Sequence, residues 1–110
     1  MCSSDLGGAC QMQFARDVAR AFIAVSDADA EGAEVHNLPG ARIAIADVVA
    51  AIGVASIGYD DVVLPFPEVT DASSFRALVP GFADTPLDQG VALTVTRFRE
   101  LLAEGLVTAP

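Results

Sequence analysis

The chain has 110 residues, enough for one small domain, and 53% of them are hydrophobic, which is typical of a globular rather than a disordered protein. Its net charge is −9, and all six positive residues are arginine. An acidic chain without a basic cluster repels phosphates, so we expect no nucleic-acid partner and no anionic membrane surface. No apolar run approaches the roughly 20 residues of a membrane span.

The opening of the chain shows neither helical nor strand periodicity. We therefore predict that residues 1–12 are irregular and not a native start, and that residues 13–110 form one domain. A flexible native terminus is the alternative. The opening contains Cys2 and Cys10 but no positively charged region or long apolar stretch, so it does not resemble a signal peptide. A cytoplasmic location with reduced thiols is the expectation.

The first regular element is predicted to be a helix over residues 16–25. Val18, Phe22 and Val25 stand at i, i+4 and i+7, which places them on one helical face. Asp17 lies in the first turn, where a carboxylate is favoured by the positive end of the helix dipole. Asp17 is therefore interpreted as a structural acid rather than a substrate ligand.

Two short extended pieces and a second helix are predicted next. Residues 34–38 favour a strand that stops at the turn signal Pro39–Gly40, and residues 42–45 favour a second extended piece. Residues 46–52 then predict a helix, which Gly53 ends.

A third strand and a short helix follow in the pattern. Residues 60–64 favour a strand, after which prolines on both sides of Phe66 enforce an extended path. Residues 74–79 favour a short helix capped by Asp71 or Ser73.

The last predicted element is a long amphipathic helix. Thr85 has the character of its capping residue, Pro86 of its first helical residue and Gly105 of its carboxy-terminal stop. Its apolar residues recur every three or four positions and make a stripe, at Leu87, Val91, Val95, Phe98, Leu101 and Leu102. Short strands packed with helices predict an α+β fold without a dinucleotide-binding domain.

Three groups of residues, in this order, resemble the carboxy-terminal, substrate-binding part of extended short-chain dehydrogenases of the NAD-dependent epimerase/dehydratase family. The matching segments are FARDVARA at 14–21, VHNLPG at 35–40 with IADVV at 45–49, and DASSFRAL at 71–78 with TPLDQGV at 85–91. Each motif alone consists mainly of residues that any similar fold would use. The resemblance is specific because the motifs occur together in this order, and together they cover most of residues 13–104.

The resemblance implies that cofactor and catalyst lie in another half of the parent enzyme. In that family an amino-terminal Rossmann domain binds NAD or NADP through a glycine-rich loop, and a tyrosine and a lysine four residues later transfer protons. This chain has no lysine and no such glycine pattern, and Tyr59 is followed four residues later by Val63. The resemblance thus predicts an inactive substrate-binding part without a cofactor. Its partners would be the missing Rossmann half, a small hydroxylated substrate and, in the parent, a possible second copy.

Asp71 is the first candidate for contact with substrate, because it matches a family position near the bound nucleotide. Family members that bind nucleotide sugars tend to carry an arginine three residues earlier, where this chain has Glu68. A carboxylate there repels a diphosphate, so a sugar or sugar acid is the expected substrate. A helix cap is an equally weighted interpretation of Asp71.

The other candidates are Asn37, Arg76 and Phe66. Asn37 matches a polar family position, with a backbone-satisfying role as the favoured alternative. Arg76 is expected to hold substrate charge or to pair with Asp71 or Asp84, and Phe66 to line a pocket or a core. His36 has no evident partner and is interpreted as a packing residue.

Two rival functions remain open at this level. The first is a stand-alone acidic binding or oligomerisation module. The second, a complete small enzyme of another class, is disfavoured because no nucleophile, base and orienting acid stand at a familiar spacing.

Overall fold

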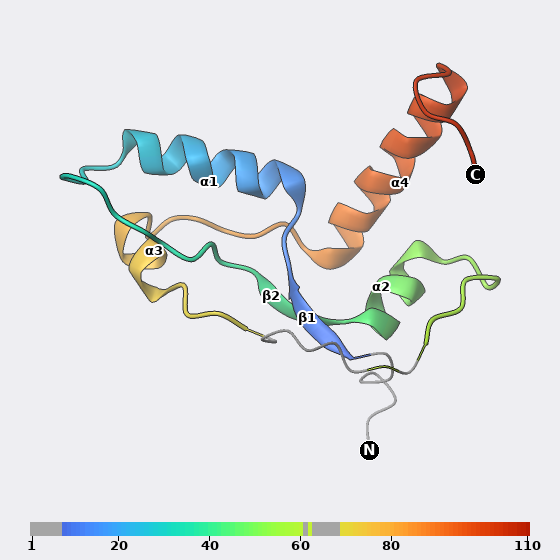
Figure 1. Cartoon of the computed structure of the whole chain (residues 1–110), viewed down its shortest axis with the longest axis horizontal. Coiled ribbons are helices and arrows are strands. Elements are labelled where there is room, and N and C mark those ends of the chain that lie inside the picture. Colours follow the sequence, from blue (N-terminus) through green and yellow to red (C-terminus); the bar gives the residue numbers. More distant parts are fainter. Residues whose placement is uncertain (1–7, 61, 63–68) are drawn as a thin grey trace.

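The computed structural model describes residues 8–60, 62 and 69–110. Its elements in chain order are β1 (Ala9–Met12), α1 (Ala15–Asp27), β2 (Ala41–Ala44), α2 (Ile45–Ile52), α3 (Ser73–Leu78) and α4 (Leu87–Ala103) (Figure 1). Helices packed around a small antiparallel sheet confirm the predicted α+β class. The described part of the chain contains no Rossmann domain.

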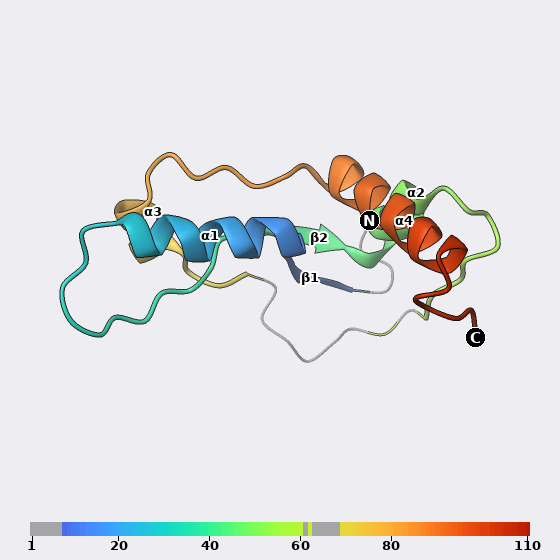
Figure 2. The same cartoon turned by 90° about the horizontal axis from the view of Figure 1, so that it is seen from above.

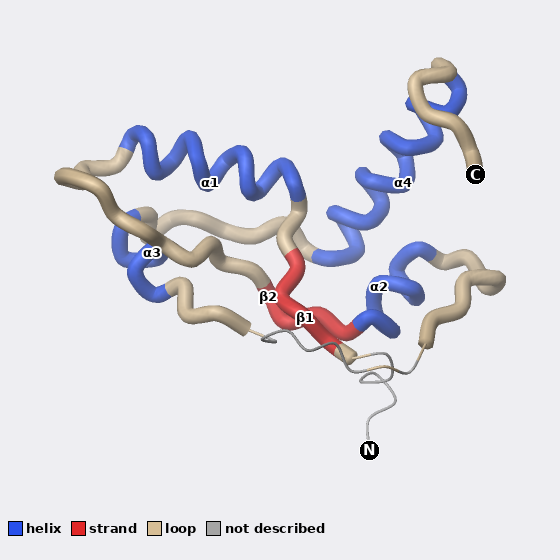
Figure 3. The backbone as a smooth tube through the Cα atoms, viewed as in Figure 1, coloured by secondary structure: helices blue, strands red, loops and turns tan. Residues whose placement is uncertain are grey.

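The sheet joins β1 to β2 as an antiparallel pair, with Ala9 opposite Ala44 and Met12 opposite Ala41 (Figure 3). The Ile45 N–H adds a bond to the Gly8 carbonyl at 3.0 Å. The prediction that residues 1–12 are irregular is therefore wrong for residues 9–12. The run Ala-Cys-Gln-Met has little strand propensity of its own, and its conformation is fixed by a partner more than 25 residues away.

The second strand lies one residue earlier than predicted, at 41–44, but residues 34–38 do not form the predicted strand. The backbone there is extended without a ladder partner. Side-chain amides take that place: Gln11 Nε2 donates to the Leu38 carbonyl at 3.1 Å, and Gln13 Nε2 to the Pro39 carbonyl at 3.3 Å. The strand predicted over residues 60–64 falls largely outside the described residues.

All four predicted helices are present, each within two residues of its expected ends. Gly53 closes α2 with a left-handed φ of 75°. Gly105, at φ 72°, closes α4: its N–H donates to the Leu102 carbonyl and that of Leu106 to the Leu101 carbonyl. These are the two bonds of a Schellman motif, in which the residue in the left-handed region satisfies the last carbonyls of the helix.

The amino-terminal end of α4 differs from the expectation. The helix begins at Leu87, Pro86 occupies the N-cap position, and no side chain caps it. The hydroxyl and N–H of Thr85 instead donate to the carboxylate of Asp17, on α1. The Thr85 hydroxyl is therefore bonded to another helix, and its oxygen accepts no hydrogen bond from the first turn of α4.

The face of α1 that is buried differs from the face that the spacing of its apolar residues predicts. Asp17 and Ala21 are buried, whereas Phe22 is 70% exposed. The segment 82–86 meets the helix on its Asp17 side because Thr85 is bonded there. The apolar side chains buried among the described residues are small except for Phe75: Ala9, Ala21, Pro39, Ala44 and Phe75.

The molecule is thin and open for its length. Its radius of gyration is 16.6 Å, against about 13 Å for a compact domain of this size. Its extents are 49 × 43 × 21 Å, and Figure 2 shows the elements spread along a flat body. A flat body leaves few side chains far from solvent, which explains the small core.

Gly40 marks the closest approach of the 38–40 segment to β1. A Cβ there would lie 2.9 Å from the Met12 carbonyl oxygen and 2.9 Å from Gln11 Cγ. We expect Gly40→Ala to lower the free energy of unfolding by about 1 to 3 kcal/mol, because the strand backbone must shift. Urea unfolding followed by far-UV circular dichroism measures it. Gly81→Ala, whose Cβ meets nothing within 4 Å, is the matched control, and an equal loss there would contradict this explanation.

Candidate functional site

Asp17 is the centre of a polar contact that ties α1 to the segment before α4. Its carboxylate accepts hydrogen bonds from the Thr85 N–H, the Thr85 hydroxyl and Arg20 Nη1, each at 2.7 Å. Burial raises the pKa of Asp17, but the bonds from Thr85 and Arg20 and the charge of Arg20 outweigh it and hold the pKa below its ordinary value. Asp17 is thus an ionised structural acid.

Arg20 extends this contact into the core. Its guanidinium donates to the Ala83 carbonyl at 3.3 Å and lies 5.0 Å from the centroid of the Phe82 ring. Phe82 in turn meets the fully buried ring of Phe75 edge-on, with centroids 5.2 Å apart. The chain of contacts from Asp17 to Phe75 holds α1, segment 82–85 and α3 together, which indicates a structural role.

Two small cavities lie beside this contact. The first has a volume of about 210 Å³, and its polar lining comes from Gln13, Asp17, Asp84 and Thr85. The second, of about 240 Å³, lies between the sheet, α2 and the start of α4 and is lined mostly by apolar side chains. Both are smaller than the usual range for ligand pockets, roughly 300 to 1,000 Å³. None of the predicted site residues lines either of them.

The structure brings two of the predicted site residues together. Asn37 Nδ2 donates to the backbone carbonyl of Asp71 at 3.0 Å, across 34 positions of sequence. The Asp71 carboxylate accepts from the Ser73 N–H at 2.9 Å, and hydrogen bonds from Ser73 lower its pKa. In both contacts a side chain bonds a backbone group, which is the structural alternative that the sequence analysis gave for these residues. The N-cap of α3 is Ala72 and not Asp71.

The other two predicted site residues are not brought to that place. Arg76 Nη2 lies 3.5 Å from Asp84 Oδ2, an ion pair on the exposed side of α3. Of the two acidic partners predicted for Arg76, Asp71 and Asp84, the structure therefore shows Asp84. Phe66 lies outside the described residues.

His36 is the functional candidate that the sequence interpretation missed. Its Nδ1 lies 3.0 Å from Ser74 Oγ and its Nε2 lies 2.9 Å from Glu34 Oε2. Both ring nitrogens of His36 therefore have a polar partner within the chain. Glu34 and His36 are two positions apart in an extended segment, so they share a side, and this spacing was the available signal.

We call the residues Glu34, His36, Asn37, Asp71 and Ser74 the polar cluster. Carboxylates, an imidazole, an amide and a hydroxyl are the groups that bind hydroxyl-bearing molecules by paired donor and acceptor bonds. Its two carboxylates repel phosphates and attract hydroxyl hydrogens. The polar cluster therefore contains the kinds of donor and acceptor groups that bond to hydroxyls.

Within the described ranges, no group of three or more histidine, cysteine, aspartate or glutamate side chains is arranged to hold a metal ion. The helices of the described residues also include none with the length and apolar character needed to cross a membrane. Comparison of the chain with protein-family models, with curated proteins and with solved structures finds no match.

Proposed function

We propose that this chain is the substrate-binding part of a cytoplasmic NAD(P)-dependent enzyme of the extended short-chain dehydrogenase type, an epimerase, dehydratase or sugar dehydrogenase. The substrate is a small hydroxylated compound, a sugar or sugar acid, held at the polar cluster. The supporting observation is the Asn37–Asp71 contact, since two positions singled out separately in the sequence meet in space.

The role of this chain in the reaction is positioning. Hydrogen bonds from the polar cluster orient substrate hydroxyls, and a fixed orientation lowers the entropic barrier to reaction. The residues of this chain do not fit NAD(P), because the nine glycines form no phosphate-binding loop and there is no lysine. Hydride and proton transfer then belong to a Rossmann half, which would meet this chain over the polar cluster, with the substrate between them.

The alternative is a stand-alone acidic module for binding or oligomerisation. The observation that favours it is the exposure of large apolar side chains on α1 and α4: Phe22, Ile23, Leu93, Phe98 and Leu102. The two functions differ in one property: only the first requires a small hydroxylated ligand at the polar cluster.

Ligand binding by the isotopically labelled chain separates these functions. We expect neutral sugars and sugar acids to shift the backbone amide resonances of residues 34–37 and 71–74 with roughly millimolar affinity, as suits a half-site. His36→Ala and Asn37→Ala should weaken this binding severalfold, because each removes a group able to bond a hydroxyl. Asp27→Ala, at the far end of α1, is the control.

Two results of that titration would contradict the proposal. One is the lack of saturable shifts at the polar cluster with every sugar and sugar acid tested. The other is tighter binding of a nucleotide-diphosphate sugar than of the free sugar, because Asp71 and Glu34 should repel the phosphates.

A further inference from the structure

Three members of the polar cluster, a serine, an imidazole and a carboxylate, are bonded in series. Ser74 Oγ lies 3.0 Å from His36 Nδ1, and His36 Nε2 lies 2.9 Å from Glu34 Oε2. A hydroxyl within bonding reach of a base, with the base oriented by a third group, is the arrangement that activates a nucleophile. Such arrangements are recognised by their geometry and not by their spacing in sequence. The fold therefore brings together the nucleophile, base and orienting acid that the sequence spacing does not show.

The two segments that carry these groups are held against each other by further contacts. Next to His36, Asn37 Nδ2 donates to the Asp71 carbonyl at 3.0 Å. Ser74 lies in the first turn of α3, directly before the fully buried Phe75, which anchors that turn in the core. The side chain of His36 is 17% exposed, whereas Ser74 is exposed. The ring is thus held in place beside a hydroxyl that a reactant can reach.

The partner of the Ser74 hydroxyl distinguishes this serine from Ser26. The Ser26 hydroxyl donates to the Ile23 carbonyl at 2.7 Å. A carbonyl oxygen holds a hydroxyl in place but does not take its proton, whereas a ring nitrogen of histidine is the commonest base in proton transfer. His36 is the single histidine of the chain, and the chain has no lysine whose amine would compete for an acyl group. Ser74 is therefore the serine with the chemical environment of a nucleophile.

We propose that Ser74 is a nucleophile that cleaves carboxylic esters, with His36 as its base and Glu34 as a positioning residue. The serine oxygen forms a bond to the acyl carbon while its proton passes to His36 Nδ1, and the bond from the acyl carbon to the leaving oxygen breaks. The leaving alcohol takes the proton from the ring. Water then attacks the acyl-serine, its proton passes through the ring to the Ser74 oxygen, and the carboxylic acid is released.

Glu34 acts on this reaction through the ring of His36. Its carboxylate orients the ring and stabilises the positive charge that the ring gains with the proton. The side chain of Glu34 is 45% exposed, so water screens this attraction and keeps its effect modest. The carboxylates of Glu34 and Asp71 and the net charge of −9 disfavour anionic acyl donors, so the substrates are neutral esters. This activity goes beyond the proposed function and depends neither on sugar binding nor on a Rossmann half.

Reaction of the full chain with the neutral ester p-nitrophenyl acetate tests this proposal. We expect a burst of nitrophenolate release, followed by slow turnover, and an acetyl group that peptide mass spectrometry places on Ser74. Ser74→Ala should abolish the burst and the adduct. His36→Gln should slow the acylation of Ser74 about a hundredfold, because it removes the base. The matched control is Ser26→Ala, which removes an exposed serine hydroxyl without an imidazole partner and should react like the wild type.

A double-mutant cycle tests the part of Glu34. Glu34→Gln should slow acylation roughly twofold to fivefold when His36 is present, and not at all in the His36→Gln background, because the carboxylate acts only through the ring. An equal effect in both backgrounds would show that Glu34 is merely structural. A wild-type chain that acquires no acetyl group on Ser74 would overturn the proposal. So would a Ser74 that is acylated as fast in His36→Gln as in the wild type, since the hydroxyl would then react unaided.

Discussion

Replacing Asp17 with alanine is expected to lower the free energy of unfolding at pH 7 by about 2 to 4 kcal/mol. The substitution removes the acceptor of both Thr85 donors and leaves their N–H and hydroxyl without a partner in a part-buried place. Most of the loss comes from these donors, because the Arg20 side chain is about half exposed and its ion pair is screened by water. Urea unfolding followed by far-UV circular dichroism provides the measurement.

The acid dependence of stability gives the check on this explanation. Because the pKa of Asp17 is lower in the folded chain, its ionisation stabilises the fold fully above its ordinary value of 3.8. That contribution is lost as the pH falls through the lower, folded pKa. The stability difference between wild type and Asp17→Asn should therefore shrink in that acid range. A stability difference that stays constant down to acid pH would show that the charge of Asp17 does not stabilise the fold. The control is Asp27→Ala, at the exposed end of α1.

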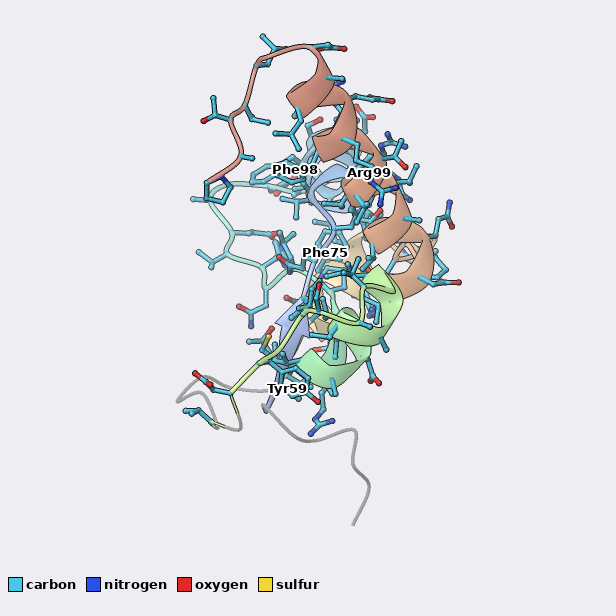
Figure 4. All side chains as sticks on the ribbon, turned by 90° about the vertical axis from the view of Figure 1, so that its right-hand side faces the viewer. Tyr59, Phe75, Phe98 and Arg99 are labelled. Atoms are coloured by element: carbon cyan, nitrogen blue, oxygen red, sulfur yellow. The ribbon has the colours of Figure 1, made fainter. Side chains whose placement is uncertain are left out.

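Replacing Phe75 with alanine should have a still larger effect, a loss of about 3 to 5 kcal/mol in the free energy of unfolding. Phe75, which is labelled in Figure 4, has no exposed surface and is the one large side chain among the buried residues described. Removing its ring opens a cavity and takes away the edge-on partner of Phe82, over which Arg20 is placed. The resulting protein should lose its cooperative unfolding transition in urea.

The comparison for this variant is Val35→Ala, which removes an apolar side chain that packs on almost nothing and should change stability by less than about 0.5 kcal/mol. Phe75→Leu, which keeps most of the volume, should be intermediate between wild type and alanine. An alanine variant as stable as the wild type would mean that the aromatic pair does not hold the fold together.

The local sequence was sufficient for the helices. The periodic apolar residues and glycine stops of α2 and α4 act within a few residues of chain, so their signals do not depend on the rest of the fold. The α+β class follows from the same elements. Asn37 and Asp71 were singled out from the sequence as candidates, but their contact with each other was not predicted.

Only the tertiary structure revealed the pairing of the sheet, the polar contact centred on Asp17 and the polar cluster. Strand β1 exists because β2 pairs with it. Residues 34–38 form no strand, and the carbonyls of Leu38 and Pro39 are bonded by the side chains of Gln11 and Gln13 instead of by a neighbouring strand. Thr85 has the sequence character of a cap, yet it bonds Asp17 from 68 positions away, and His36 meets Ser74 across 38. Hydrogen bonds between distant residues depend on which segments the fold brings together, and no window of local sequence contains that information.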